Sequence, residues 1–398
     1  MLNRLNSVAI AGALVVTACL IPPRAEAQGI ARRISAVRDG KVRMTFAARE
    51  DICGWGDGIQ TGYRNNRNEN HNWSSSSRSE DVIYDRGCSE GPVRLVVTMA
   101  NGAPYRIKTY VGGQWRQASG VTDLGNVSTR DATDFLMSVA NNQSGKAAEE
   151  ALFPVTIADS INATQSLYTL AKNQSRPNDV RGSAIFWLSQ VEDERAVAML
   201  EDILETARNQ EIADKAIFGL SQHSSGKGYP ILRAYVENES NSEDMRGKAI
   251  FWLGQRKSGD RENYLRGLYS RVRSEELKDK VIFSISQQRT AESQQWLLDI
   301  VTNTREPMEM RKKALFWAGQ NGTPMEKLTS LYSRMDSREM KDQMIFVFSQ
   351  RRERAAFDKL MDIAKNDPDR EARRKAMFWL GQSRDPRVAT FLSDLINR

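Results

Sequence analysis

The sequence has very little of the chemistry on which hydrolytic enzymes and metalloproteins usually depend. Among its 398 residues there are two histidines, His71 and His223, and three cysteines. Histidines this far apart leave little material for general acid–base work or for a zinc site. No Ser-His-Asp set, GxSxG, HExxH or phosphate-binding glycine loop is present. We therefore expect a protein that is not an enzyme and that uses neither a metal ion nor a cofactor.

Long apolar runs are missing after the N-terminal segment. The stretch from Val8 to Ile21 is too short for a permanent transmembrane helix. With Arg4 before it and the A-x-A site Ala25–Ala27 behind it, the stretch is typical of an export signal. We predict that residues 1–27 form a signal peptide, that no transmembrane segment remains after its removal, and that the mature chain is periplasmic or secreted. The alternative is a lipoprotein signal in which Cys19 is lipidated.

A concentrated basic stripe is also missing, although the formal net charge is +7. Basic and acidic residues alternate along the chain, which is typical of solvated helix faces. Nucleic-acid binders usually concentrate Lys and Arg on one face. We therefore expect no nucleic acid among the partners.

Removal of the signal leaves Cys53 and Cys88, an even pair that indicates one disulfide in an exported chain. Short alternating runs around them predict a small antiparallel β-domain over residues 28–125, with Asn101-Gly102 as a hairpin turn. Within this domain, residues 65–81 have almost no apolar side chains. We interpret them as a long mobile loop, with Trp73 as a candidate binding anchor.

The most informative feature is a heptapeptide that recurs seven times at spacings of 30 to 33 residues: AIFWLSQ, AIFGLSQ, AIFWLGQ, VIFSISQ, ALFWAGQ, MIFVFSQ and AMFWLGQ. A fixed period of this length indicates one supersecondary unit used repeatedly. Each unit resolves into a helix A with the heptapeptide and a helix B with a recurring leucine, at Leu200, Leu232, Leu265, Leu297, Leu328, Leu360 and Leu392. The pattern predicts a mainly α fold: a HEAT-like solenoid of about seven to eight two-helix repeats preceded by the small disulfide-linked β-domain.

The repeats extend upstream of the clear copies. We assign residues 126–398 to the solenoid and residues 176–398 to its clear repeats. Residues 145–175 form a degenerate first repeat in which Pro154 replaces the tryptophan and is expected to kink helix A. Leu136 belongs to a lone helix B before it.

Two sets of recurring residues are interpreted as a structural ladder. Tryptophans occupy the same place in alternate repeats, and we predict that their rings are buried between neighbouring repeats: Trp187, Trp252, Trp317 and Trp379. Stacking on planar ligands is the competing interpretation. Glutamines close every clear helix A and are expected to form a polar ladder between adjacent loops: Gln190, Gln222, Gln255, Gln287, Gln320, Gln350 and Gln382.

A binding site on a solenoid is expected where the repeats differ. The position after the helix B leucine varies most, so we take it as the candidate partner-binding surface: Glu201, Arg233, Arg266, Leu298, Thr329 and Met361. Arg233 and Arg266 occupy adjacent repeats and are candidates to clamp a carboxylate or phosphate. Unrelated surface arginines are the alternative.

The helix A pattern from Asp244 to Gln255 resembles the short bacterial HEAT-like repeats of the type named from phycobilisome lyases. The full layout of signal, small β-domain and repeats resembles exported bacterial HEAT-repeat-domain proteins. The resemblance implies a fold and no transferable activity. We expect a non-enzymatic interaction scaffold or adaptor of the periplasm or cell envelope, whose partner is another envelope protein or peptide. A carbohydrate- or cell-wall-binding module is the alternative.

Overall fold

The computed structural model describes residues 23–55, 58–61, 72–74, 80–84, 87–255, 259–335, 337–383 and 385–396. The chain divides into two compact units, the first ending at Trp187 and the second beginning at Leu188. Cys19 and most of the predicted signal peptide lie outside the described residues. Helix α1 (Pro23–Ser35) includes the predicted cleavage position after Ala27.

Three small sheets form the first part of unit one, with strand orders β10-β1-β7-β8, β4-β3-β2-β6 and β5-β9. In strand β1 (Gly40–Phe46), buried and less buried side chains alternate: Val42, Met44 and Phe46 are buried, and the residues between them are not. The strands are β1 (Gly40–Phe46), β2 (Ile52–Trp55), β3 (Gly58–Thr61), β4 (Asn72–Ser74), β5 (Val82–Ile83), β6 (Ser89–Glu90), β7 (Val93–Ala100), β8 (Ala103–Val111), β9 (Gln114–Trp115) and β10 (Val121–Asn126).

The predicted hairpin turn is confirmed. Asn101 and Gly102 both have positive φ, at 53° and 79°, and they connect the antiparallel strands β7 and β8. One pairing differs from the antiparallel prediction: β10 runs parallel to β1. This pair joins residues about eighty positions apart (Lys41 with Val121), so no local turn signal marks it.

The predicted disulfide is present. Cys53 in β2 is bonded to Cys88 just before β6, with the Cα atoms 5.4 Å apart. The predicted mobile loop needs a correction, because Asn72–Ser74 within it forms β4 and pairs with β3. Backbone hydrogen bonds to the edge of β3 pair this short polar segment with the sheet although it has no apolar pattern. Residues 65–71 and 75–79 of that loop, and the side chain of Trp73, lie outside the described structure.

Helices complete unit one: α2 (Thr129–Asn142), α3 (Lys146–Glu150), α4 (Leu152–Thr156) and α5 (Thr164–Lys172). The helix predicted around Leu136 is α2, which starts where the Ser128 hydroxyl accepts a hydrogen bond from the amide of Asp131. The kink predicted at Pro154 takes the form of a break in helix A. Helix α3 ends at Glu150, four residues before Pro154, and α4 begins at Leu152, so that Pro154 lies in its first turn.

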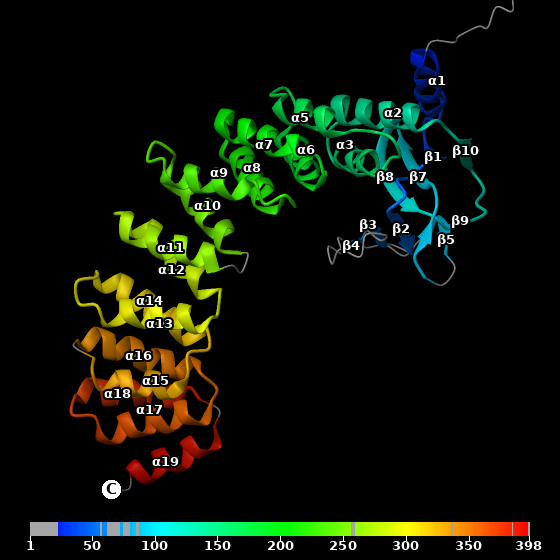
Figure 1. The fold of residues 1–398 in the computed structure, drawn as a ribbon. Helices are drawn as coiled ribbons and strands as arrows, with labels where there is room; N and C mark the ends of the chain where they lie inside the picture. Colours follow the sequence, from blue (N-terminus) through cyan, green and yellow to red (C-terminus); the bar gives the residue numbers. More distant parts are fainter. Residues whose placement is uncertain are drawn as a thin grey trace, which may run out of the picture. The chain divides into compact units, whose positions relative to one another are not determined.

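Seven helix pairs then follow one another along the described chain (Figure 1). They are α6 (Asn178–Gln190) with α7 (Arg195–Thr206), α8 (Gln210–Gln222) with α9 (Gly228–Glu237), α10 (Glu243–Gln255) with α11 (Gly259–Arg271), α12 (Glu275–Ser286) with α13 (Ala291–Thr302), α14 (Met308–Gln320) with α15 (Met325–Tyr332), α16 (Arg338–Gln350) with α17 (Arg354–Asn366), and α18 (Arg370–Gly381) with α19 (Pro386–Ile396). The predicted fold class, a mainly helical repeat solenoid after a small β region, is confirmed.

Neighbouring repeats are joined along their A helices. Helix α10 packs against α8 and α12, and α16 packs against α14 and α18. The six helix B leucines from Leu200 to Leu360 are each at most 1% exposed. In alternate repeats an arginine near the start of helix A donates to a backbone carbonyl at the end of the preceding helix B: Arg181 to Ala171, Arg246 to Val236, Arg311 to Val301 and Arg373 to Asp367.

Candidate functional site

The candidate site is a cavity of about 540 Å³ in the second unit, between the α7–α8 connection and the α9–α10 connection. Glu201, one of the predicted partner-binding residues, lines it. The remaining lining residues come from four consecutive helices and their connections: Leu204, Glu205, Ala207, Arg208, Asn209, Gln210, Ala213, Ile231, Ala234, Tyr235, Asn238, Asn241, Ser242 and Met245.

The floor of this cavity is apolar. Leu204, Ala213 and Met245 line it and are each at most 6% exposed. Tyr235 adds an aromatic wall, and burial raises the pKa of its phenol. An apolar floor with convergent polar groups is the usual composition of a binding pocket.

Amide and carboxylate side chains lie around the floor. Asn241 donates through Nδ2 to the carbonyl oxygen of Tyr235 at 2.8 Å, which holds the α9–α10 connection in place. Glu201 and Glu205 contribute two carboxylates and Arg208 one guanidinium. Within the described part of the chain, neither Glu201 nor Glu205 has an ion-pair partner. The cavity therefore presents net negative charge that the fold itself does not neutralise.

The two candidate arginines have different surroundings. Arg233 is exposed, and its guanidinium carbon lies 4.2 Å from the centroid of the Tyr264 ring. Arg266 is partly buried and forms an ion pair with the buried carboxylate of Glu262, one turn before it. Each guanidinium therefore has a partner inside the protein, so the proposed shared clamp has no support from these contacts.

The other candidate positions after the helix B leucine do not form one continuous surface. Leu298 was expected to be solvated, and this is wrong: it is 8% exposed, because α13 places two successive leucines, Leu297 and Leu298, against neighbouring helices. Thr329 donates its hydroxyl hydrogen to the carbonyl of Glu326 in its own helix. Met361 is partly buried. Of the six candidates, Glu201 lies at this cavity.

The alternating tryptophans form an aromatic ladder with the phenylalanines of the preceding repeats. The ring centroids are 4.8 to 5.4 Å apart in the pairs Phe153–Trp187, Phe218–Trp252, Phe283–Trp317 and Phe346–Trp379. All four tryptophans are partly buried, so their rings lie between neighbouring repeats without being fully enclosed. In α10, Ala249, Ile250 and Leu253 take the buried face, which leaves Trp252 at its edge.

The expected glutamine ladder between loops is also wrong for the contacts that the structure describes. Gln190, Gln222, Gln287 and Gln350 each donate to the serine immediately before them. Gln255 reaches a carbonyl within its own helix, and Gln320 and Gln382 are exposed. A side chain at the end of helix A reaches its own last turn more readily than a loop in the next repeat, so these amides stabilise single helices.

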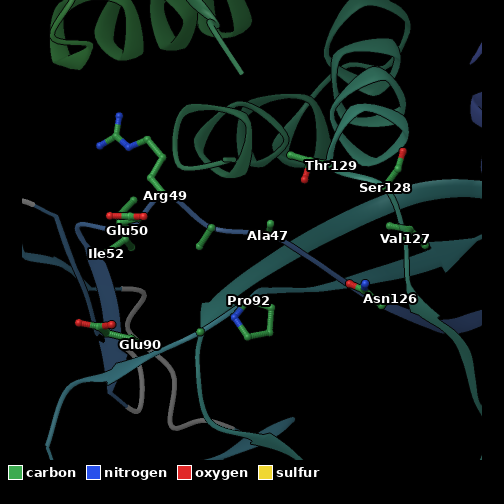
Figure 2. A pocket seen from close by; sticks show the side chains of 12 residues that line it. Ala47, Arg49, Glu50, Ile52, Glu90, Pro92, Asn126, Val127, Ser128 and Thr129 are labelled. Carbon is green, nitrogen blue, oxygen red and sulfur yellow. The ribbon is translucent and has the colours of Figure 1, made fainter. Parts of the chain in front are cut away.

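A second cavity, of about 630 Å³, lies in the first unit between the β sheets and the start of α2 (Figure 2). Arg49, Glu50 and Glu90 bring charge to it, and Arg49 forms an ion pair with Asp51 at 3.4 Å. Ser128, also in its lining, is engaged in capping α2. The polar groups of this cavity thus have structural roles.

The described residues contain no cluster of three or more His, Cys, Asp and Glu side chains arranged for a metal ion. His223 is 1% exposed, and its Nδ1 lies 2.9 Å from the hydroxyl of Ser225. Among the described helices, none combines the length and apolar character needed to cross a bilayer.

Comparison with known proteins supports the repeat assignment. Residues 180–206 match the PBS lyase HEAT-like repeat. Solved structures to which this chain is similar include human deoxyhypusine hydroxylase, at 16% identity over 64% of this chain and 96% of that one, with a TM-score of 0.28. The CpcE–CpcF phycocyanin lyase complex from Nostoc is similar at 11% identity over 57% and 92% of the two chains, with a TM-score of 0.30.

Yeast importin-beta is similar at 8% identity, over 63% of this chain and 46% of importin, with a TM-score of 0.34. No curated protein sequence matches this chain. Residues 180–206 are thus similar to a HEAT-like repeat.

Proposed function

Because the chain is built of HEAT-like repeats, we propose that it is a non-enzymatic scaffold or adaptor that binds another protein or peptide of the bacterial cell envelope. The observation that carries this proposal is the cavity between α7 and α10, where an apolar floor and unpaired carboxylates lie on a regular helical array. A stack of helix pairs offers an extended surface, and partner specificity arises where one repeat departs from the others.

The non-enzymatic part of the proposal is supported by the placement of His223, which is enclosed by the fold. Tyr269 and Tyr332, two further groups with strongly perturbed pKa values, donate their hydroxyls to the protein's own carboxylates. These two phenols therefore have structural partners.

We propose a periplasmic location for the mature chain. The signal-like pattern that ends at Ala27 and the disulfide between Cys53 and Cys88 both support it, since disulfides persist in oxidising compartments. Fractionation and intact mass measurement test this, with Gln28 expected as the first residue. Lipidated Cys19 at the mature N-terminus would instead establish an anchored lipoprotein.

Affinity capture with the mature chain tests the scaffold proposal. The expected result is retention of a protein partner from periplasmic extract, detected by mass spectrometry and reproduced with the purified partner. The same capture with the Cys53–Cys88 disulfide reduced tests whether the β-sheet region of the first unit is needed for partner binding, because the disulfide lies in that region. Retention on peptidoglycan or glycan without any protein partner would contradict the proposal and favour the carbohydrate- or cell-wall-binding alternative.

A further inference from the structure

The alternation of repeats creates three equivalent places in the second unit. Each combines the residue four positions after a helix B leucine, the residue three positions before the next heptapeptide, and a residue in the following inter-repeat connection. In the middle copy these are Tyr269, Lys278 and Glu306. The phenol of Tyr269 donates to Glu306 Oε2 at 2.9 Å, and Lys278 Nζ lies 3.4 Å from the same oxygen and 4.8 Å from the Tyr269 ring centroid.

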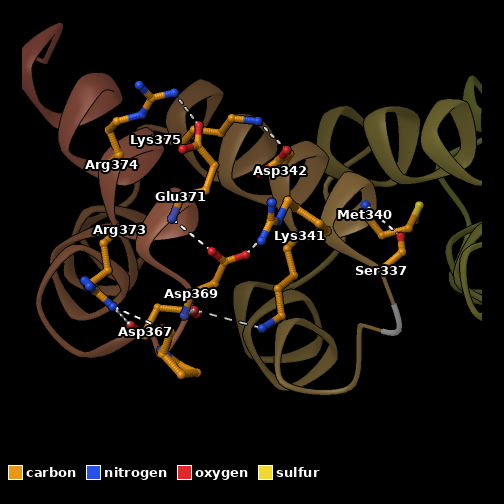
Figure 3. A network of polar contacts seen from close by, with 12 residues as sticks. Ser337, Met340, Lys341, Asp342, Asp367, Asp369, Glu371, Arg373, Arg374 and Lys375 are labelled. Atoms are coloured by element: carbon orange, nitrogen blue, oxygen red, sulfur yellow. Dashed lines mark hydrogen bonds and ion pairs between the residues drawn. The ribbon is translucent and has the colours of Figure 1, made fainter.

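The last copy repeats this arrangement with Tyr332, Lys341 and Asp367, and Figure 3 shows Lys341 beside Asp367. Tyr332 donates to Asp367 Oδ2 at 2.8 Å, and Lys341 Nζ lies 4.0 Å from Asp367 Oδ1. The ammonium is 5.5 Å from the Tyr332 ring centroid. In both copies, therefore, a phenol, an ammonium and a carboxylate fill the space between two inter-repeat connections.

The first copy lacks all three groups. Its equivalent residues are Leu204, Ala213 and Asn241. All three line the cavity of about 540 Å³. The cavity thus lies at the place that the protein fills with its own tyrosine, lysine and acid in the other two copies.

We propose that this cavity receives a tyrosine side chain and an adjacent lysine or arginine side chain of a partner polypeptide. They would take the place that Tyr269 and Lys278, or Tyr332 and Lys341, occupy in the filled copies. This inference rests on the proposed function and names the class of partner for it.

The lining suits those two groups. Leu204, Ala213 and Met245 provide an apolar floor for an aromatic ring. Asn241 Nδ2 is bonded to the Tyr235 carbonyl, and its amide oxygen is an acceptor for a phenol, as Glu306 is in the middle copy. Glu201 and Glu205 supply the negative charge that a basic side chain needs, and with Arg208 they leave a net charge of −1 around the cavity.

The decisive variant fills the first copy with the residues of the second: Leu204→Tyr, Ala213→Lys and Asn241→Glu together. The probe is a fluorescein-labelled peptide, Gly-Ser-Lys-Tyr-Lys-Ser-Gly, and binding to the full chain is followed by fluorescence polarisation. We expect the wild-type chain to bind it, the filled variant to bind at least about tenfold more weakly, and the peptide with glutamates in place of its lysines not to bind.

A second variant tests the same cavity without the bulky substitutions of the filled variant, which could prevent folding. Glu201→Gln with Glu205→Gln changes little volume and should weaken peptide binding about threefold to tenfold. Because the wild-type carboxylates attract the lysines of the peptide, added salt should weaken wild-type binding more than binding by this variant. Glu292→Gln, an exposed acid in α13 away from the cavity, is the matched control and should leave binding unchanged.

Equal binding by wild type and by a folded filled variant overturns the inference, as does the absence of peptide binding at about 1 mM. The two proposals are separable. If the filled variant still captures the same protein from periplasmic extract as wild type, the cavity assignment fails and the scaffold proposal stands. If wild type captures no protein at all, the scaffold proposal itself fails.

Discussion

Gly254 in α10 lies directly against Ser284 in α12, and a Cβ atom on Gly254 would lie 2.6 Å from the Cβ of Ser284. The Ser284 hydroxyl donates across the interface to the carbonyl oxygen of Ile250 in α10, at 3.3 Å. The same relationship recurs two repeats further along the stack, between α14 and α16, where a Cβ on Gly319 would lie 2.5 Å from a methyl of Val347. Adjacent A helices therefore approach closely wherever the alternate repeat carries a small residue in place of tryptophan.

This close approach predicts an unusual effect of alanine. In an ordinary helix Gly→Ala stabilises by about 0.5–1 kcal/mol. Gly254→Ala should instead lower the free energy of unfolding by about 1–3 kcal/mol, because the added methyl group forces α10 and α12 apart. Urea unfolding of the full chain measures the change.

Gly381 provides the matched control, since it occupies the same register in the last repeat. It closes α18, and nothing lies within 4 Å of a Cβ built there. Gly381→Ala should leave stability unchanged or raise it slightly. Equal losses in the two variants would contradict the close-packing argument.

The aromatic ladder predicts a stability effect at Trp252. Its ring lies 4.8 Å from that of Phe218 in the preceding repeat and 5.0 Å from that of Phe251. Trp252→Ala should cost about 2 kcal/mol, less than a fully buried aromatic because the ring is only partly enclosed. The loss should also broaden thermal unfolding, since repeats are coupled through their neighbours. Trp252→Phe keeps a ring, so it should lose only roughly half of the free energy of unfolding that Trp252→Ala loses. An unaltered melting curve for the alanine variant would favour ligand stacking at this ladder.

The sequence predicts the repeat architecture because each repeat must bury the same residues against its neighbours. Leu200 and its equivalents are therefore buried as expected. Helix rotation is less well determined: Trp252 follows a strong apolar pattern but lies at the edge of the buried face. Leu298 shows the reverse error, since a position that is solvated in one repeat is apolar and buried in another.

The candidate site was only partly visible in the sequence. Variation after the helix B leucine points to Glu201, but the cavity itself depends on residues such as Leu204 and Ala213, which look like ordinary helix residues. Their significance appears only on comparison with Tyr269 and Lys278 in the same register. The parallel pairing of β1 with β10 is likewise invisible to local patterns, because it joins distant segments.

The buried His223 predicts a loss of stability in mild acid. Burial lowers the pKa of its imidazole, so the folded state prefers the neutral ring. Below about pH 6.5 the unfolded chain binds a proton that the folded chain resists, so stability falls as pH falls through this window. His223→Gln removes this contribution. The free energy of unfolding should therefore drop less between about pH 7.5 and pH 5.5 in the variant than in wild type. Parallel curves for the two proteins would rule out the buried ring as the cause.

The phenol–carboxylate bond of the middle copy predicts an effect at the opposite end of the pH range. Burial, with the bond to Glu306, raises the pKa of Tyr269 well above its usual range, so the folded state holds its phenol proton. Tyr269→Phe leaves Glu306 without this donor and should cost about 1–2 kcal/mol at pH 7. Above about pH 10 the unfolded chain releases the phenol proton while the folded chain keeps it, so stability falls as pH rises. The variant, which has no such proton, should lose less stability than wild type between about pH 9 and pH 11. Tyr105→Phe is the control, because Tyr105 is 64% exposed. Its free energy of unfolding should match that of wild type both at pH 7 and between about pH 9 and pH 11. If Tyr269→Phe matched the control in denaturant unfolding at pH 7, the Tyr269–Glu306 bond would contribute nothing to joining these repeats.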